Sequence, residues 1–195
     1  MNERIKEFQC IMPVANIPSV LGHGILSYEL MSKLPHHSVA MPEIQDRRDQ
    51  KHVPGGLRLH QYANLYFHAR NPMLFKRQTQ FSELCVLQIS VEVSKLEGVV
   101  FADCNASSDY VRFLHPSQSN LLNLDDIYAM DWRHPNDSTA YFRHKSRKCA
   151  EVLIPQRVEP KFIAGAYVLN AKVAESLKVL GFTPPITISP VLFFN

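Results

Sequence analysis

A glutamate and a pair of arginines are the residues of this sequence whose types and settings are suited to chemistry. Glu151 lies in the otherwise apolar run "KCAEVLIP" (148–155), which is predicted to be a strand with Cys149, Glu151 and Leu153 on one face. A carboxylate in such surroundings is costly unless it is paired or used. Glu151 therefore lies either in a functional cleft or on an edge strand that faces water, and the residues alone leave both open.

The adjacent Arg47 and Arg48 stand in the segment "EIQDRRDQKHVPGG" (43–56). Arginine keeps its proton, so its functional uses are to bind phosphate or carboxylate groups and to stabilise developing negative charge. The alternative is that Asp46 and Asp49 pair with them at the surface, where ion pairs contribute little to stability. By pattern alone, surface pairing is favoured.

The segment "RHPNDSTAYFRHKSRK" (133–148) concentrates positive charge. Its five Lys and Arg residues face a single acid, Asp137, which gives 5 − 1 = +4 in a chain whose formal charge is +3. Tyr141 and Phe142 add aromatic rings. Single-stranded nucleic acids are bound in this way, by cations that contact phosphates and by rings that stack on bases. The alternative is a solvated, flexible loop.

Other kinds of site and other locations are not indicated. The four cysteines are scattered without a CxxC pair, and the "PHHS" loop (35–38) lacks a ligand set, so no metal is expected. No run approaches the roughly 18 apolar residues that cross a bilayer, and the first residues lack the apolar core of a signal peptide. We expect a cytoplasmic protein with one domain over 1–195 and no membrane contact.

Short strands and helices must position these residues. Helices are predicted after Asn16, over 119–132, and over 171–180 between the cap Asn170 and Gly181. Strands are predicted over 8–14, 59–68, 85–93, 98–103, 148–155, 161–169 and 186–194. The order lacks regular βαβ alternation, which favours the α+β class with a largely antiparallel sheet.

Two further stretches carry candidate pocket residues. His60 and Tyr62, two apart on a predicted strand, would project from one face, either as packed aromatics or as donors in a pocket. Met73, in "ARNPMLFKR" (69–77), belongs to an apolar group that either fills the core or lines a pocket. The core is the simpler interpretation of Met73.

Taken in order, these segments resemble the DarT family of toxin DNA ADP-ribosyltransferases. The resemblance rests on "NIPSVLGHGIL", "IQDRR", "PGG", "LHQYANLYFHARNPMLF", "FADCNAS", "MDW" and "KCAEVLI", at compatible spacing from about residue 8 to 165. It implies an ADP-ribosyltransferase fold, with a split, mostly antiparallel β-sheet core and flanking helices. NAD⁺ is then expected in the cleft between the sheets.

The resemblance also implies roles for single residues. Arg48 and Glu151 match the catalytic arginine and glutamate of the family. The expected contacts to NAD⁺ are Asn16, Gly22, Gly24, His60, Tyr62 and Met73. The family's loop before the glutamate contacts nucleic acid, and the corresponding candidates here are Tyr141, Arg143, Lys145, Arg147 and Lys148.

The function that the resemblance implies is transfer of ADP-ribose from NAD⁺ to a nucleobase of single-stranded DNA, without a metal. Such an enzyme is the toxin of a toxin–antitoxin system, and a separate macrodomain-type antitoxin is the expected partner. One alternative is the same chemistry on RNA. Another is a catalytically inactive nucleic-acid-binding module, because Cys10 and Pro13 stand where family members often carry histidines.

Overall fold

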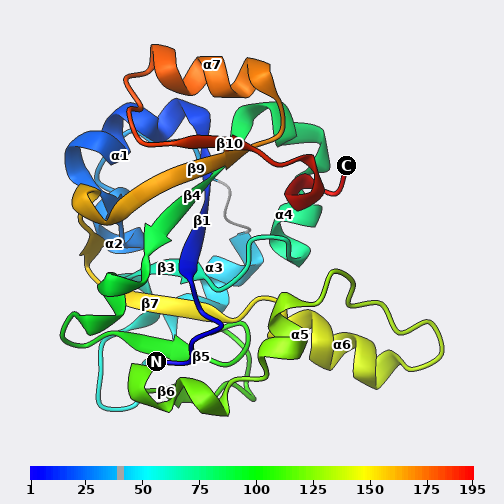
Figure 1. Cartoon of the computed structure of the whole chain (residues 1–195). Coiled ribbons are helices and arrows are strands. Elements are labelled where there is room, and N and C mark those ends of the chain that lie inside the picture. Colours follow the sequence, from blue (N-terminus) through cyan, green and yellow to red (C-terminus); the bar gives the residue numbers. More distant parts are fainter. Residues whose placement is uncertain (39–41) are drawn as a thin grey trace.

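The computed structural model describes residues 1–38 and 42–195, and its main element is a sheet of eight strands in the order β10-β9-β4-β1-β3-β7-β5-β6 (Figure 1). Neighbouring strands run antiparallel except β10 and β9, which are parallel. The strands are β1 Glu7–Pro13, β3 Tyr62–Tyr66, β4 Leu84–Ser90, β5 Val100–Ala102, β6 Phe113–Leu114, β7 Glu151–Pro155, β9 Ile163–Val168 and β10 Ile186–Ile188. A small second sheet pairs β2 Ile25–Leu26 with β8 Arg157–Val158. The α+β class with a mostly antiparallel sheet is confirmed.

The sheet divides between β1 and β3. All seven residues of β1 pair with β4, whereas β1 and β3 pair at one position, Gln9 with Tyr66. One half of the sheet therefore contains β10, β9, β4 and β1, and the other contains β3, β7, β5 and β6. The split expected for the sheet lies at this junction.

Three phenylalanines hold the two halves together. Phe8 of β1 contacts Phe67, just after β3, with ring centroids 5.6 Å apart, and Phe101 of β5 lies 5.7 Å from Phe8 and 5.0 Å from Phe67. All three rings are buried. Edge-to-face pairs of this kind add about 0.5–1.5 kcal/mol beyond the burial of their area. On β3, side chains alternate, so that Ala63 and Leu65 join this core while their neighbours face the other way.

Short helices close the ends and faces of the sheet. They are α1 Ile17–His23, α2 Tyr28–Met31, α3 Pro42–Asp49, α4 Pro72–Phe75, α5 Leu124–Tyr128, α6 Ser138–Arg147 and α7 Ala171–Val179. In Figure 1, α5 and α6 lie together beside the end of β7, and α7 covers the opposite end of the molecule. Within the described residues, none of these helices has the length and apolar character needed to span a bilayer.

Several predicted elements have different limits. Residues 59–61 and 91–95 form 3-10 turns, so β3 begins later and β4 ends earlier than predicted. The helix predicted over 119–132 is divided into a 3-10 turn over 116–121 and α5. The basic segment is a loop only over residues 133–137, because α6 follows, and Asp137 caps it by accepting a hydrogen bond from the Ala140 N–H at 2.9 Å.

Candidate active site

Arg48 and Glu151 form a buried ion pair. Arg48 is in the last turn of α3 and Glu151 is the first residue of β7, yet Arg48 Nη1 lies 2.8 Å from Glu151 Oε2. The other carboxylate oxygen, Oε1, accepts a hydrogen bond from the backbone N–H of Ala106 at 2.9 Å. Both oxygens are thus fixed, and the side chains are only 6% and 2% exposed.

Glu151 does not lie on an edge strand. β7 pairs with β3 on one side and with β5 on the other, so the water-facing alternative is wrong. The predicted alternation is confirmed, since Val152 and Ile154 join the core while Glu151 faces a cavity. Burying two charges is expensive, and such a pair is stable only while both partners are present.

The cavity occupies the split in the sheet and has a volume of about 980 Å³. β1 and β3 form its floor, and α3, α4 and α6 contribute side chains to its walls. Among the predicted NAD⁺ contacts it brings Asn16, Tyr62 and Met73 together with Arg48 and Glu151. Met73 therefore lines a cavity, in contrast to the simpler expectation of a core residue.

Asn16 fixes the segment that covers one side of this cavity. Its side chain does not cap α1. Instead its Nδ2 donates to the carbonyl of His37 at 2.8 Å, and its Oδ1 accepts from the His37 N–H at 2.9 Å. His37 and Ser38 also line the cavity.

Three predicted NAD⁺ contacts, Gly22, Gly24 and His60, lie outside the cavity lining. Gly24 has φ +83°, and an added Cβ would lie 2.0 Å from the carbonyl oxygen of Val158, so this glycine is required by close backbone packing. A Cβ on Gly22 would meet nothing within 4 Å.

His60 and Tyr62 do not share a face, because His60 belongs to a 3-10 turn rather than to β3. The His60 ring lies 3.1 Å from the Gln45 side-chain oxygen and 3.3 Å from a carboxylate oxygen of Asp49. Burial, followed by the charge of Arg48, lowers the pKa of His60. His60 thus supports α3, the helix that carries Arg48.

Arg47 does not form the expected surface pairs. It is exposed and lines the cavity, and within the described part of the chain it makes no ion pair with Asp46 or Asp49. Asp49 is instead engaged by His60. Arg47 therefore presents a positive charge at the cavity, a setting suited to a phosphate group.

The basic helix α6 divides its residues between different tasks. Phe142 and Lys145 line the cavity, and Phe142 is 64% exposed. The Lys145 ammonium lies 5.2 Å from the centre of the Tyr141 ring. Arg143 is exposed, and Arg147 Nη1 lies 2.7 Å from the carboxylate of Asp126.

The prediction that Lys148 contacts nucleic acid is wrong. Its side chain is fully buried, and its Nζ donates hydrogen bonds to the carbonyls of Ile127 and Ala129. A cation held in this way cannot reach a phosphate group outside the protein. Lys148 follows α6 directly, and the chain has already turned inward toward β7 at this point.

Two cavity residues of β3 were missed from the sequence. Asn64 and Tyr66 line the cavity with Tyr62, since alternate residues of a strand share a face. Tyr66 is the partner of Glu151 in the β3–β7 register. Burial and then the Glu151 carboxylate raise the pKa of Tyr66 well above its ordinary value, so Tyr66 is a neutral phenol. The 62, 64, 66 alternation in "YANLY" was the signal that identifies both residues.

The loop that supplies Ala106 is held from two sides. Lys51, just after α3, donates to the carbonyl of Ser108 and lies 3.1 Å from a carboxylate oxygen of Asp109. The Asn105 N–H donates to the carbonyl of Ser146, in α6, at 3.0 Å. The Ala106 N–H is therefore preorganised against Glu151.

Comparison with known proteins identifies a family whose sequence model matches this chain. The sequence model of the family described as "ssDNA thymidine ADP-ribosyltransferase, DarT" matches residues 10–194. A DNA ADP-ribosyl transferase–DNA ADP-ribosyl glycohydrolase fusion protein of Thermosipho africanus is 29% identical over 206 residues, which cover 100% of this chain and 51% of that relative. The chain thus spans about half the length of this relative.

Solved structures share the fold. Thermosipho africanus DarTG in complex with ADP-ribose has a TM-score of 0.85 and 27% identity, over 97% of this chain and 51% of that chain. Thermus sp. 2.9 DarT in complex with ADP-ribosylated ssDNA has a TM-score of 0.85 and 22% identity, over 98% of both chains. The same Thermus protein in complex with NAD⁺ has a TM-score of 0.80 and 20% identity, over 98% of this chain and 99% of that chain.

Proposed function

Because the chain belongs to the DarT family, as the sequence resemblance indicated, we propose that it transfers ADP-ribose from NAD⁺ to a thymidine of single-stranded DNA. The observation that carries the proposal is the buried Arg48–Glu151 pair, with the carboxylate turned into a cavity of about 980 Å³. Ligand sites have volumes of roughly 300–1,000 Å³, so the cavity has room for a dinucleotide.

Glu151 acts on the ribose of NAD⁺ and on the attacking base. The bond between nicotinamide and ribose C1′ breaks, nicotinamide leaves as a neutral molecule, and the ribose carries positive charge in the transition state. A fixed carboxylate stabilises that charge. A ring nitrogen of the base then forms the new bond to C1′ and passes its proton to Glu151, which acts as general base.

Arg48 supplies positive charge beside Glu151. Its guanidinium holds one carboxylate oxygen and stabilises the negative charge that develops on a base as it loses its proton. It does not act as a proton acceptor, because arginine stays protonated in proteins. The residues that would contact NAD⁺ line the same cavity: Asn16, Arg47, Tyr62, Asn64 and Met73.

The single-stranded substrate is bound along α6. Lys145 and Arg143 contact phosphates, and Phe142 and Tyr141 stack on bases next to the modified one. Arg147 is exposed on the same helix and keeps its ion pair with Asp126. The modified base must be unpaired to enter the cavity, and this costs least in a single strand.

Labelled NAD⁺ tests this function. The protein is incubated with labelled NAD⁺ and with DNA or RNA oligonucleotides of matched sequence, and label is expected on the DNA in a thymidine-dependent manner. Label on RNA alone would establish the RNA alternative, and label on neither, for a protein that binds DNA, would establish an inactive binding module. Mass spectrometry of the labelled oligonucleotide identifies the base.

We also propose the setting of this reaction. The Thermosipho relative joins a transferase to a DNA ADP-ribosyl glycohydrolase, which supports a macrodomain-type antitoxin as the partner of this chain. The proposed toxin acts in the cytoplasm, and residues 1–195 form its single transferase domain. Restoration of growth when such a glycohydrolase is expressed with the protein tests the partnership, and growth arrest that the glycohydrolase leaves unchanged contradicts it.

A further inference from the structure

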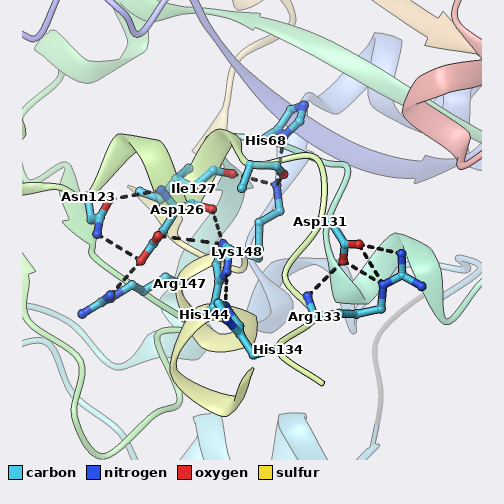
Figure 2. A network of polar contacts seen from close by, with 11 residues as sticks. His68, Asn123, Asp126, Ile127, Asp131, Arg133, His134, His144, Arg147 and Lys148 are labelled. Atoms are coloured by element: carbon cyan, nitrogen blue, oxygen red, sulfur yellow. Dashed lines mark hydrogen bonds and ion pairs between the residues drawn. The ribbon is translucent and has the colours of Figure 1, made fainter. Parts of the chain in front are cut away.

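Lys148 joins three separate segments of the chain (Figure 2). Its Nζ lies 2.7 Å from the carbonyl oxygen of Ile127, 2.8 Å from that of Ala129 and 3.1 Å from Nδ1 of His68. Ile127 and Ala129 are at the C-terminal end of α5, and His68 follows β3. Lys148 itself lies between α6 and β7, three residues before Glu151.

The contacts satisfy the ammonium group completely. An ammonium has three N–H donors, and the three contacts use all of them. The last carbonyls of a helix lack partners within the helix and carry partial negative charge, so they suit a cation. Burial and then the charge of Lys148 lower the pKa of His68 to about 4, which keeps its ring neutral and able to accept.

Lys148 differs from an ordinary surface lysine in its burial and in its partners. Within residues 1–38 and 42–195 it makes no ion pair with a carboxylate, although its side chain is fully buried. A buried charge without a counter-ion is costly and is therefore kept where its position matters. The proposed transfer reaction does not use the charge of Lys148, which indicates that this charge has a structural role.

α5 and α6 are tied to one another around Lys148. Arg147 pairs with the Asp126 carboxylate at 2.7 Å, and Nε2 of His144 lies 3.0 Å from the Asp126 carbonyl. Nδ1 of His144 lies 3.0 Å from Nε2 of His134, so His134 donates to His144 when His144 donates to the carbonyl. Figure 2 shows these contacts on the side of the two helices next to Lys148. The two helices thus form one unit.

We propose that Lys148 is a positioning residue that fixes this helical unit, and with it Phe142 and Lys145, relative to Glu151. The inference rests on the proposed function, because these two side chains are the expected contacts to the DNA strand. Glu151 is held separately, by Arg48 and by the Ala106 N–H. Loss of Lys148 therefore displaces Phe142 and Lys145 more than it displaces the Glu151 carboxylate.

The variant Lys148→Met tests the proposal, because it removes the ammonium and keeps a long apolar side chain. The expected result is a loss of about tenfold or more both in single-stranded DNA affinity and in transfer at saturating NAD⁺, since a displacement of about 1 Å is able to cost up to 100-fold. The dissociation constant of NAD⁺, measured by calorimetry, is expected to stay within about twofold of the unaltered protein. Lys172→Met, an exposed lysine in α7, is the matched control and changes neither quantity.

The salt dependence of DNA binding separates positioning from direct contact. Each phosphate contact to a single strand contributes about −0.7 to the slope of log affinity against log salt concentration. Lys145→Met is expected to make the slope shallower by about that amount. Lys148→Met is expected to weaken binding with an unchanged slope, because Lys148 touches no phosphate.

Several results would overturn the inference. They are DNA binding and transfer by Lys148→Met equal to those of the control, a shallower salt slope for Lys148→Met, or equal losses of NAD⁺ and DNA binding. If Lys148→Met does not fold, His68→Leu removes one of the three acceptors and is held to the same criteria. Absence of transfer by the unaltered protein would contradict the proposed function itself, whereas transfer that is indifferent to Lys148 contradicts only this inference.

Discussion

Two buried cations lie close to the cavity, Arg48 in its lining and Lys148 behind α6, and the partners of these cations differ. Arg48 of α3 lines the cavity and pairs with the carboxylate of Glu151, on β7, at 2.8 Å. On the helical side, Lys148 binds neutral carbonyls and an imidazole, and it faces away from solvent. Under the proposed function, the cation next to the fixed carboxylate takes part in transfer, whereas the cation at the end of α5 holds the two helices in place. We call the part of the cavity with Arg48 and Glu151 the reacting wall and the part with Phe142 and Lys145 of α6 the binding wall.

Removal of Arg48 is expected to give the largest effect. Arg48→Ala leaves the Glu151 carboxylate buried without its counter-ion, which lowers the free energy of unfolding by about 3–5 kcal/mol. Transfer is expected to fall by about 10²–10³-fold, as it does when one charge-stabilising donor is lost. Denaturant unfolding and the rate of label transfer measure the two changes, and Arg157→Ala, an exposed arginine of β8, is the control. Transfer by Arg48→Ala at the rate of the control would contradict a role for Arg48 in the reaction.

The next largest effect is the dependence of the free energy of unfolding on pH, which we expect to involve Lys148. Burial lowers the pKa of Lys148 from 10.5 to about 8, so between these values the unfolded chain binds more protons than the folded one. The cost of the buried charge is fully present below pH 8 and is relieved as the pH rises toward 10.5. The free energy of unfolding of the unaltered protein should therefore rise relative to Lys148→Met, by at most about 1.4 kcal/mol per pH unit. A difference between the two proteins that stays constant from pH 7 to 10 contradicts this account.

Truncation of Phe142 tests whether the binding wall contacts single-stranded DNA. Stacking of a base on an aromatic side chain contributes about 1–3 kcal/mol, so Phe142→Ala should weaken single-stranded DNA binding by about 5- to 150-fold. The affinity for NAD⁺ should change little, because Phe142 is 64% exposed at the edge of α6 and is not among the residues expected to contact NAD⁺. Fluorescence anisotropy measures the DNA affinity, and Val179→Ala, an exposed site in α7, is the control. A loss of NAD⁺ affinity as large as the loss of DNA affinity would show that Phe142 contacts both ligands and would contradict the division into two walls.

The smallest effect is expected from Arg147. Its ion pair with Asp126 joins α5 to α6 but is 45% exposed on the arginine side. Exposed pairs contribute about 0–1 kcal/mol, so Arg147→Met should change the free energy of unfolding by no more than that. If thermal unfolding shows a larger loss, Arg147 shares with Lys148 the task of holding the helical unit.

The location of Arg48 and Glu151 in one cavity was expected from the sequence and the family resemblance, and the location of the α6 residues only in part. Strand alternation in "KCAEVLIP" places Glu151 opposite the core, and the family resemblance selects Arg48 over Arg47. No local pattern shows that these two residues, 103 apart, are in contact. That contact depends on the packing of α3 beside the cavity that Glu151 faces, which is a tertiary feature.

Lys148 and Gly24 show why the position of a single residue could not be predicted from its neighbours in the sequence. A lysine at the end of a basic helix resembles its exposed neighbours, and only the turn into β7 buries it. Gly24 matches a family segment, but the close approach of the Val158 carbonyl determines its identity. The burial of Lys148 and the close packing of Gly24 both depend on segments that are distant in the sequence.

Replacement of Glu151 tests the central claim most directly. Glu151→Gln keeps the size and an acceptor for the Ala106 N–H, but it removes the negative charge and the proton acceptor. Label transfer from NAD⁺ to a single-stranded oligonucleotide is expected to fall by about 10²–10⁴-fold, while DNA binding and cooperative unfolding persist. Glu175→Gln, an exposed glutamate of α7, should transfer at the rate of the unaltered protein. Transfer by Glu151→Gln at the rate of Glu175→Gln would contradict a catalytic role for the buried pair.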